Sequence, residues 1–246
     1  MHGPYFGVGT DHDLTPRISR PFKATLFTKG LLRWARRNLR EFPWREEGRS
    51  LYEVFVAEFF MTQTPAQNVA AVYPHFISKF PTLSDVRSAS LEEIATAIEP
   101  LGLQNRRARA LKAIASKWDE LPTAMDRLVD LDRVGPYVAS ATLCLALGQR
   151  LGVVDRNVRR IYRRLLGKDW PTSETAQVGF ATLMVPRRNP GKFNMALLDF
   201  GALICKKVPL CHRCFASEYC EYFAAGGDRG VRLLAVPAGK RDLGDE

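Results

Sequence analysis

Four closely spaced cysteines impose the strongest constraint on what this chain can fold into. The pattern C-x5-C-x2-C-x5-C spans sixteen of the 246 residues and consists of Cys205, Cys211, Cys214 and Cys220. Four thiolates at this spacing can close one loop around a tetrahedral zinc ion or a cubane iron–sulfur cluster. Typical zinc modules have two C-x2-C arms, whereas this loop has one, so the pattern favours a [4Fe–4S] cluster. The spacing alone does not exclude zinc.

The charge balance favours a polyanionic partner. Lys and Arg outnumber Asp and Glu by 36 to 26, a net charge of +10, which accelerates encounter with nucleic acid. The chain contains no run of about 18 apolar residues, so we do not expect a membrane span. The N-terminus shows no basic start followed by an apolar region, so we expect no secretion signal and a monomeric, cytoplasmic, nucleoid-associated protein.

Apolar residues recur at helical spacing along most of the chain, and no stretch alternates as a strand does. The prediction is an all-α fold. Residues 1–22 and 225–246 are rich in Gly, Pro and polar residues and are interpreted as an N-terminal arm and a C-terminal tail. The expected helices cover 24–39, 51–80, 90–98, 104–118, 123–131, 137–147, 155–167, 173–185 and 192–204.

A glycine-bearing link joins two of the predicted helices. The link runs through Arg133, Val134 and Gly135, where Gly135 is free to take a positive φ and Pro136 suits the first helical position. Backbone N–H groups at such a helix start can hold a DNA phosphate without reading sequence. An ordinary αα-hairpin is the alternative interpretation.

Two carboxylates stand out by position. Asp155 precedes a helix with the apolar stripe Val158, Ile161, Tyr162 and Leu165, so it is placed as an N-cap. It could equally stabilise cationic sugar character or activate water beside a groove. Glu58 lies on an apolar helical face, where burial would raise its pKa as an acid catalyst requires. Pairing with an arginine is the alternative for Glu58.

Together these residues resemble the endonuclease III and adenine glycosylase branch of the helix-hairpin-helix DNA glycosylases. The resemblance runs from Trp34 to Cys220, and its landmarks occur in the family's order. They are Phe42-Pro43-Trp44-Arg45, the Glu58 helix with Gln63-Thr64, Leu101-Gly102-Leu103, the hairpin, Val154-Asp155-Arg156-Asn157-Val158 and the four cysteines.

The resemblance implies two helical lobes flanking a cleft for double-stranded DNA. Residues 49–167 would form a six-helix bundle with the hairpin, and 23–48 plus 168–224 the iron–sulfur lobe. Asp155 matches the family's catalytic aspartate. Gln63 and Leu103 match positions that wedge into the base stack when the target nucleotide is flipped out. Arg156, in the basic cluster after Asp155, is predicted to contact DNA with the hairpin link.

Tyr137 separates the subtypes within this family. Bifunctional members carry a lysine here that forms a Schiff base with the sugar, which a phenol does not form at neutral pH. The resemblance therefore implies a monofunctional glycosylase, similar to those that remove thymine or uracil opposite guanine, with Asp155, Glu58 and Tyr137 in the active site. Two departures are that Arg133 replaces the first hairpin glycine and that the first cysteine gap is one residue short.

Three alternatives remain open. Glu58 also matches the catalytic glutamate of adenine glycosylases, although only 26 residues follow Cys220, fewer than their C-terminal domain needs. A non-catalytic DNA-binding protein with a structural or redox cluster is a second alternative, motivated by the altered hairpin and the short cysteine gap. An enzyme adapted to a bulky modified pyrimidine is the third.

Overall fold

The computed structural model describes residues 23–227, so the predicted arm 1–22 and most of the predicted tail lie outside the described residues. Within that range the chain forms α-helices and short 3-10 turns and no strand, which confirms the all-α prediction. No helix in this range is long and apolar enough to cross a membrane. The helices are α1 (Ala24–Ala35), α2 (Leu51–Phe60), α3 (Ala66–Lys79), α4 (Leu83–Ser88), α5 (Leu91–Ala97), α6 (Gln104–Lys117), α7 (Met125–Val129), α8 (Pro136–Leu147), α9 (Arg156–Leu166), α10 (Glu174–Met184), α11 (Pro190–Leu203) and α12 (Glu221–Ala224).

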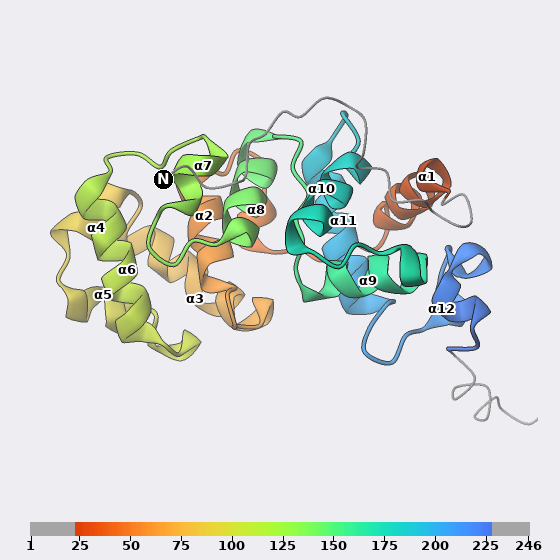
Figure 1. Cartoon of the computed structure of the whole chain (residues 1–246). Helices are drawn as coiled ribbons and strands as arrows, with labels where there is room; N and C mark the ends of the chain where they lie inside the picture. Colours follow the sequence, from red (N-terminus) through yellow and green to blue (C-terminus); the bar gives the residue numbers. More distant parts are fainter. Residues whose placement is uncertain (1–22, 228–246) are drawn as a thin grey trace, which may run out of the picture.

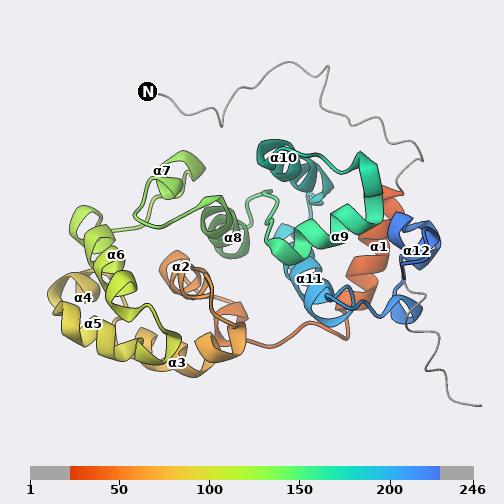
Figure 2. The same ribbon diagram turned by 60° about the horizontal axis from the view of Figure 1, so that its bottom comes forward.

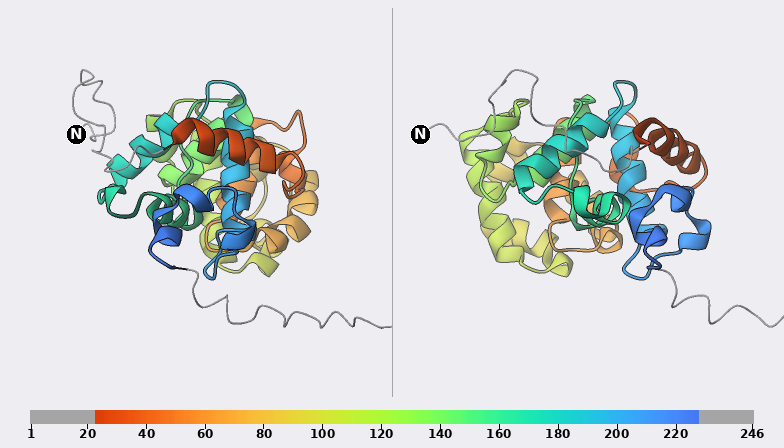
Figure 3. Two further views of the ribbon diagram at one scale, coloured as in Figure 1. Left: turned by 90° about the vertical axis from the view of Figure 1, so that its right-hand side faces the viewer. Right: turned by 45° about the vertical axis from the view of Figure 1, so that its right-hand side comes forward.

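The helices gather into two groups, each around its own hydrophobic core (Figures 1 and 2). The first, the bundle core, is built from α2 to α8 with Phe55, Phe60 and Phe76 fully buried. The second, the C-terminal core, is built from α1 and α9 to α11, and α1 packs against α11 (Figure 3). Helix α8 contributes residues to both cores, so it joins the two groups.

Helix α9 packs in the C-terminal core, which differs from the lobe boundary predicted at residue 167. Its stripe of Val158, Ile161, Tyr162 and Leu165 is buried there with residues of α1, α10 and α11. The predicted boundary followed chain order, whereas burial of this stripe decides where the helix lies. The break between the cores therefore falls between α8 and α9, close to Asp155.

Side-chain caps fix where several helices begin. Ser50 and Glu53 form a capping box at α2, and Ser90 and Glu93 form one at α5. A third box, Thr82 with Asp85, starts the six-residue α4, a helix that the sequence analysis did not predict. A helix of about one and a half turns contains too few apolar residues for a helical period to be detected in the sequence.

The hairpin consists of α7, the link and α8, and its backbone differs from the prediction at one point. Pro136 begins α8 as expected, but Gly135 is extended, with φ −90° and ψ 175°. The positive φ falls on Arg133 instead, at 60°. Glycine at this position in related hairpins would adopt that conformation at lower cost, because a Cβ crowds the backbone there.

Candidate active site

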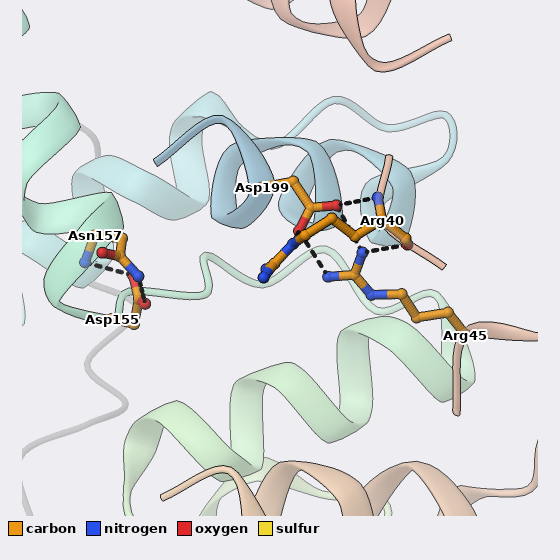
Figure 4. A network of polar contacts seen from close by, with 5 residues as sticks. All are labelled: Arg40, Arg45, Asp155, Asn157 and Asp199. Carbon is orange, nitrogen blue, oxygen red and sulfur yellow. Dashed lines mark hydrogen bonds and ion pairs between the residues drawn. The ribbon is translucent and has the colours of Figure 1, made fainter. Parts of the chain in front are cut away.

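Asp155 caps α9, as predicted, with three hydrogen bonds to its carboxylate. Oδ1 accepts from the backbone N–H of Asn157 at 2.8 Å and of Val158 at 2.7 Å. Oδ2 accepts from Nδ2 of Asn157 at 2.8 Å, and the Asn157 side chain lies beside Asp155 in Figure 4. The cap therefore fixes the carboxylate rigidly at the start of α9, where the two cores meet.

Glu58 of α2 lies buried and is hydrogen-bonded to Tyr137 of α8. Its side chain is only 1% exposed, and the Tyr137 hydroxyl donates to Oε2 at 3.0 Å. Burial raises the pKa of Glu58 from 4.5 to about 7, while the Tyr137 bond and the nearby Arg45 cation lower it in part and Asp155 raises it further. Glu58 is thus poised to hold a proton near neutral pH.

The three predicted catalytic residues come together from α2, α8 and the start of α9. Burial raises the pKa of Tyr137 well above 10, and the negative charges of Glu58 and Asp155 raise it further. Its phenol consequently stays neutral and serves as a hydrogen-bond donor to Glu58. The Asp155 charge raises the pKa of both Glu58 and Tyr137, so the start of α9 lies near the hydrogen-bonded Glu58–Tyr137 pair.

A buried ion-pair network lies next to this site, and the sequence analysis missed it. Asp199 of α11 is fully buried, and its carboxylate accepts four hydrogen bonds, two from Arg40 and two from Arg45 (Figure 4). The shortest two, from Arg40 Nε and Arg45 Nη1, measure 2.7 Å. Arg45 therefore links Asp199 to Glu58, whose pKa it lowers.

A chain of hydrogen bonds leads from the Asp155 cap to the cysteine loop. Asn157 Oδ1 accepts from Arg160 Nη2 at 3.0 Å. The same guanidinium donates to the backbone oxygens of Cys205 and Gly201, both at 2.8 Å. Arg160 therefore points inward and ties α9 to the end of α11.

The predicted wedge residues lie on two exposed loops. Gln63 follows α2 and Leu103 precedes α6, and both side chains are exposed, Leu103 by 46%. Both residues have left-handed backbones, with φ values of 62° and 53°. Arg107, in the first turn of α6, is buried beneath these loops.

The predicted hairpin contacts separate into two kinds. Arg133 and Gly135 are exposed, and so is Arg156 at the start of α9. Val134 is only 5% exposed, and its N–H donates to the oxygen of Leu131 at 3.1 Å. Val134 thus anchors the link in the bundle core, while its two neighbours face outward.

The four cysteines line one cavity next to α9 and α12. The cavity encloses about 300 Å³ of space free of protein atoms, part of it open to solvent. Burial, with a smaller contribution from the other three thiols, raises the pKa of Cys214 to about 12. Arg164 Nη1 lies 3.4 Å from the Cys205 sulfur.

Four thiols that line one cavity are a donor set that both zinc sites and iron–sulfur clusters use. Among residues 23–227, no group of three or more His, Cys, Asp or Glu side chains is arranged as a metal site. The number of thiols matches the four cysteine ligands that a [4Fe–4S] cluster takes. The arginine beside Cys205 also suits a negatively charged, thiolate-ligated group.

A protein-family model matches the middle of the chain. Residues 56–182 match the model of the HhH-GPD superfamily of base excision DNA repair proteins. The thymine/uracil-DNA glycosylase of Methanothermobacter thermautotrophicus is 31% identical over 210 residues, which cover 82% of this chain and 95% of that protein. The adenine DNA glycosylase of Mycobacterium tuberculosis is 34% identical over 206 residues, covering 80% of this chain and 67% of that protein.

Solved structures agree with these relatives. A thermostable thymine-DNA glycosylase superposes with a TM-score of 0.79 at 31% identity, covering 82% of this chain and 97% of that one. An endonuclease III bound non-covalently to DNA superposes with a TM-score of 0.72 at 21% identity, covering 86% of this chain and 97% of that one. At 21% identity, the second comparison supports the fold alone.

Proposed function

We propose that this chain, which belongs to the HhH-GPD superfamily of base excision DNA repair proteins, is a monofunctional DNA glycosylase that releases thymine or uracil opposite guanine. The convergence of Glu58, Tyr137 and Asp155 at one site is the observation that carries the proposal. Similarity to thymine/uracil-DNA glycosylases over most of the chain supports this substrate class. Release of free base from T:G and U:G duplexes tests it.

The site provides the two functions that base removal needs. As the N-glycosidic bond breaks, its electrons pass to the base and the sugar acquires oxocarbenium character. Protonated Glu58 gives its proton to the departing base or its exocyclic oxygen, and the Asp155 carboxylate faces the cationic sugar. Water then adds to the anomeric carbon and gives a proton back to the Glu58 carboxylate, and an abasic site remains in the intact strand.

Substrate binding requires that the target nucleotide leave the duplex. We propose double-stranded DNA as the partner, with Arg133, Gly135 and Arg156 contacting its backbone and Gln63 and Leu103 entering the stack. The exposed positions of these five side chains and backbones support this arrangement. DNA-bound endonuclease III shares the fold, which is consistent with the same docking mode.

The rate of base release is expected to fall as pH rises through about 7. Glu58 must carry its proton to donate it, and its pKa of about 7 means that the protonated fraction declines above that pH. Single-turnover rates measured between pH 5.5 and 9 check this. The Glu58→Gln variant should be slower at every pH, and its rate should not fall as the pH rises through about 7.

The raised pKa of Glu58 also makes the stability of the folded protein depend on pH, and this dependence gives an independent check of the pKa. The unfolded chain loses the Glu58 proton near pH 4.5, while the folded chain keeps it to about pH 7. Stability therefore decreases as pH rises between these values, because the folded state binds more protons. Wild type should lose melting temperature relative to Glu58→Gln across that window. An equal pH dependence in both proteins would contradict the assigned pKa.

Replacing Tyr137 by lysine is expected to create strand-cleaving activity. A lysine amine at this position can attack the anomeric carbon and form a Schiff base that eliminates the 3′ phosphate, which the phenol does not. Trapping with borohydride should yield a covalent protein–DNA adduct for Tyr137→Lys only. Tyr137→Phe is the matched control, and nicking by wild type would contradict the monofunctional assignment.

The cysteine loop is proposed to hold a [4Fe–4S] cluster through Cys205, Cys211, Cys214 and Cys220. When bound, the cluster links the two ends of this loop covalently and so orders the segment that Arg160 and Arg164 contact. Because the four thiols share one cavity, the protein is expected to be brown, with broad absorption at about 400 nm.

Iron analysis checks the cluster proposal. Four irons per chain are expected for wild type, and Cys214→Ser should lose both iron and the absorption band. Cys144→Ser is the matched control, because Cys144 is buried in α8 away from the loop and should keep the iron. Stoichiometric zinc without iron in wild type would contradict the proposal.

An adenine glycosylase is the second candidate function. It is favoured by the 34% identity to adenine DNA glycosylases and by the buried Glu58, which the resemblance matches to their catalytic glutamate. Release of adenine opposite oxidised guanine, with no release from T:G or U:G, would select this function instead.

A further inference from the structure

Two loops on the bundle carry exposed residues in a conformation that side chains disfavour. Gln63 and Leu103 have φ values of 62° and 53°, in the left-handed region that is unfavourable for a non-glycine residue. Gln63 lies between α2 and α3, and Leu103 lies 40 positions later, directly before α6. Something in the surrounding structure must hold both backbones in place.

The buried guanidinium of Arg107 contacts both loops at once. Its side chain comes from the first turn of α6 and is 3% exposed. Toward the first loop, Nη2 donates to Phe60 O, Thr62 O and Thr64 Oγ1, at 3.1, 2.7 and 2.8 Å. Toward the second, Nη1 donates to Leu101 O and Gly102 O, at 3.1 and 3.0 Å.

A direct bond closes this arrangement. The Thr64 hydroxyl, which accepts from Arg107, donates to Leu101 O at 3.2 Å. The two loops are therefore joined to each other as well as to the guanidinium between them. Gln63 is flanked on both sides by residues in this network, Thr62 and Thr64, and Leu103 directly follows Gly102.

The cost of burying the Arg107 guanidinium indicates that this side chain holds the two loops together, and another residue would do so less well. Burying a guanidinium whose hydrogen bonds go to carbonyl and hydroxyl oxygens is costly, and desolvation lowers the pKa of Arg107. The acceptors at Phe60 and Thr62 lie at the C-terminal end of α2, where carbonyls lack helical partners and the dipole is negative. A planar fork reaches several such acceptors, whereas a lysine ammonium is a single point charge.

We propose that Arg107 is a positioning residue that fixes the spacing between Gln63 and Leu103, so that both side chains enter the duplex as one rigid wedge. The inference rests on the proposed function, in which these residues occupy the space of the flipped nucleotide. Arg107 itself lies beneath the loops and touches no DNA. Because Arg107 already holds the two loops together, the protein does not lose conformational entropy by ordering each loop separately when the nucleotide is flipped out.

The test compares substrates that differ in how much work flipping requires. Arg107→Lys keeps the charge but removes the fork, and Arg109→Lys, at an exposed position on the same helix, is the matched control. With U:G duplex, Arg107→Lys should lower the single-turnover rate by about 10- to 100-fold. With uracil in a one-nucleotide bulge, where unpairing costs least, the loss should stay within about threefold.

A second readout does not depend on base release. In an Asp155→Asn background, 2-aminopurine placed next to the target reports unstacking by its fluorescence when protein binds. Arg107→Lys should reduce that signal at saturating protein, and Arg109→Lys should leave it unchanged. If wild type released no base but the 2-aminopurine difference persisted, the proposed function would fail while the wedge assignment held.

A milder variant protects the test against misfolding. Thr64→Val removes the hydroxyl that joins Arg107 to Leu101 O with almost no change in volume. It should show the same preference for the bulged substrate, with a smaller loss on the duplex. Equal losses on duplex and bulge for both variants, or no loss on either substrate, would overturn the proposal.

Discussion

Replacing Asp155 by asparagine is expected to lower the rate of base release by about 10²- to 10⁴-fold while leaving the fold almost unchanged. The oxocarbenium ion that forms at the sugar needs a negative charge, which the amide lacks. Asparagine is as good an N-cap as aspartate, so its side-chain oxygen can still accept from the N–H groups of Asn157 and Val158. Single-turnover rates and thermal melting measured together separate the charge from the cap.

Two further variants complete this comparison. Asp155→Ala should lose both the activity and about 1 kcal/mol of stability, because it removes the cap as well. Ser173→Ala removes the side-chain cap of α10, at a site distant from Asp155 in the chain, and should lose similar stability without losing activity. If Asp155→Asn kept the wild-type rate, Asp155 would be a structural cap alone and the mechanism would be wrong.

Replacing Asp199 by alanine is expected to destabilise the protein by about 3–5 kcal/mol, the usual cost of removing one partner of a buried ion pair. The carboxylate is fully buried and is the acceptor for both Arg40 and Arg45. Its loss leaves two guanidinium groups facing each other in a partly buried space. For a chain of this length we expect the melting temperature to fall by about 10 °C.

An exposed ion pair gives the matched control for this prediction. Arg159 and Glu174 form a salt bridge whose side chains are 44% and 70% exposed. Glu174→Ala should cost less than about 1 kcal/mol, because solvent screens that pair. A loss of similar size in Asp199→Ala and Glu174→Ala would show that the buried network contributes little to stability.

Local features of the site could be predicted from the sequence because each is encoded by a few neighbouring residues. The Asp155 cap follows from an aspartate directly before an apolar stripe of period 3.6, and its geometry is confirmed. The buried Glu58 follows from a lone carboxylate on the apolar face of a helix, and its burial is confirmed. Pro136 as the first residue of α8 follows from its fixed φ.

The remaining features depend on contacts between distant segments. Asp199 lies 154 positions from Arg45, and the sequence around neither residue indicates that the two side chains form an ion pair. Arg107 stands among exposed arginines with no pattern to mark it as the buried one. Gly135 is free to take a positive φ, but the turn places the positive φ on Arg133, which stands where the family's hairpin has its first glycine. In each case tertiary packing overrides the local preference.

Single-turnover base release from a panel of duplexes tests the central claim most directly. The panel contains T:G, U:G, adenine opposite oxidised guanine and oxidised pyrimidines, each assayed with and without alkali. A monofunctional thymine/uracil glycosylase releases base from T:G or U:G and gives strand breaks only after alkali. Breaks without alkali would contradict the role assigned to Tyr137, and no base release from any duplex would contradict glycosylase function itself.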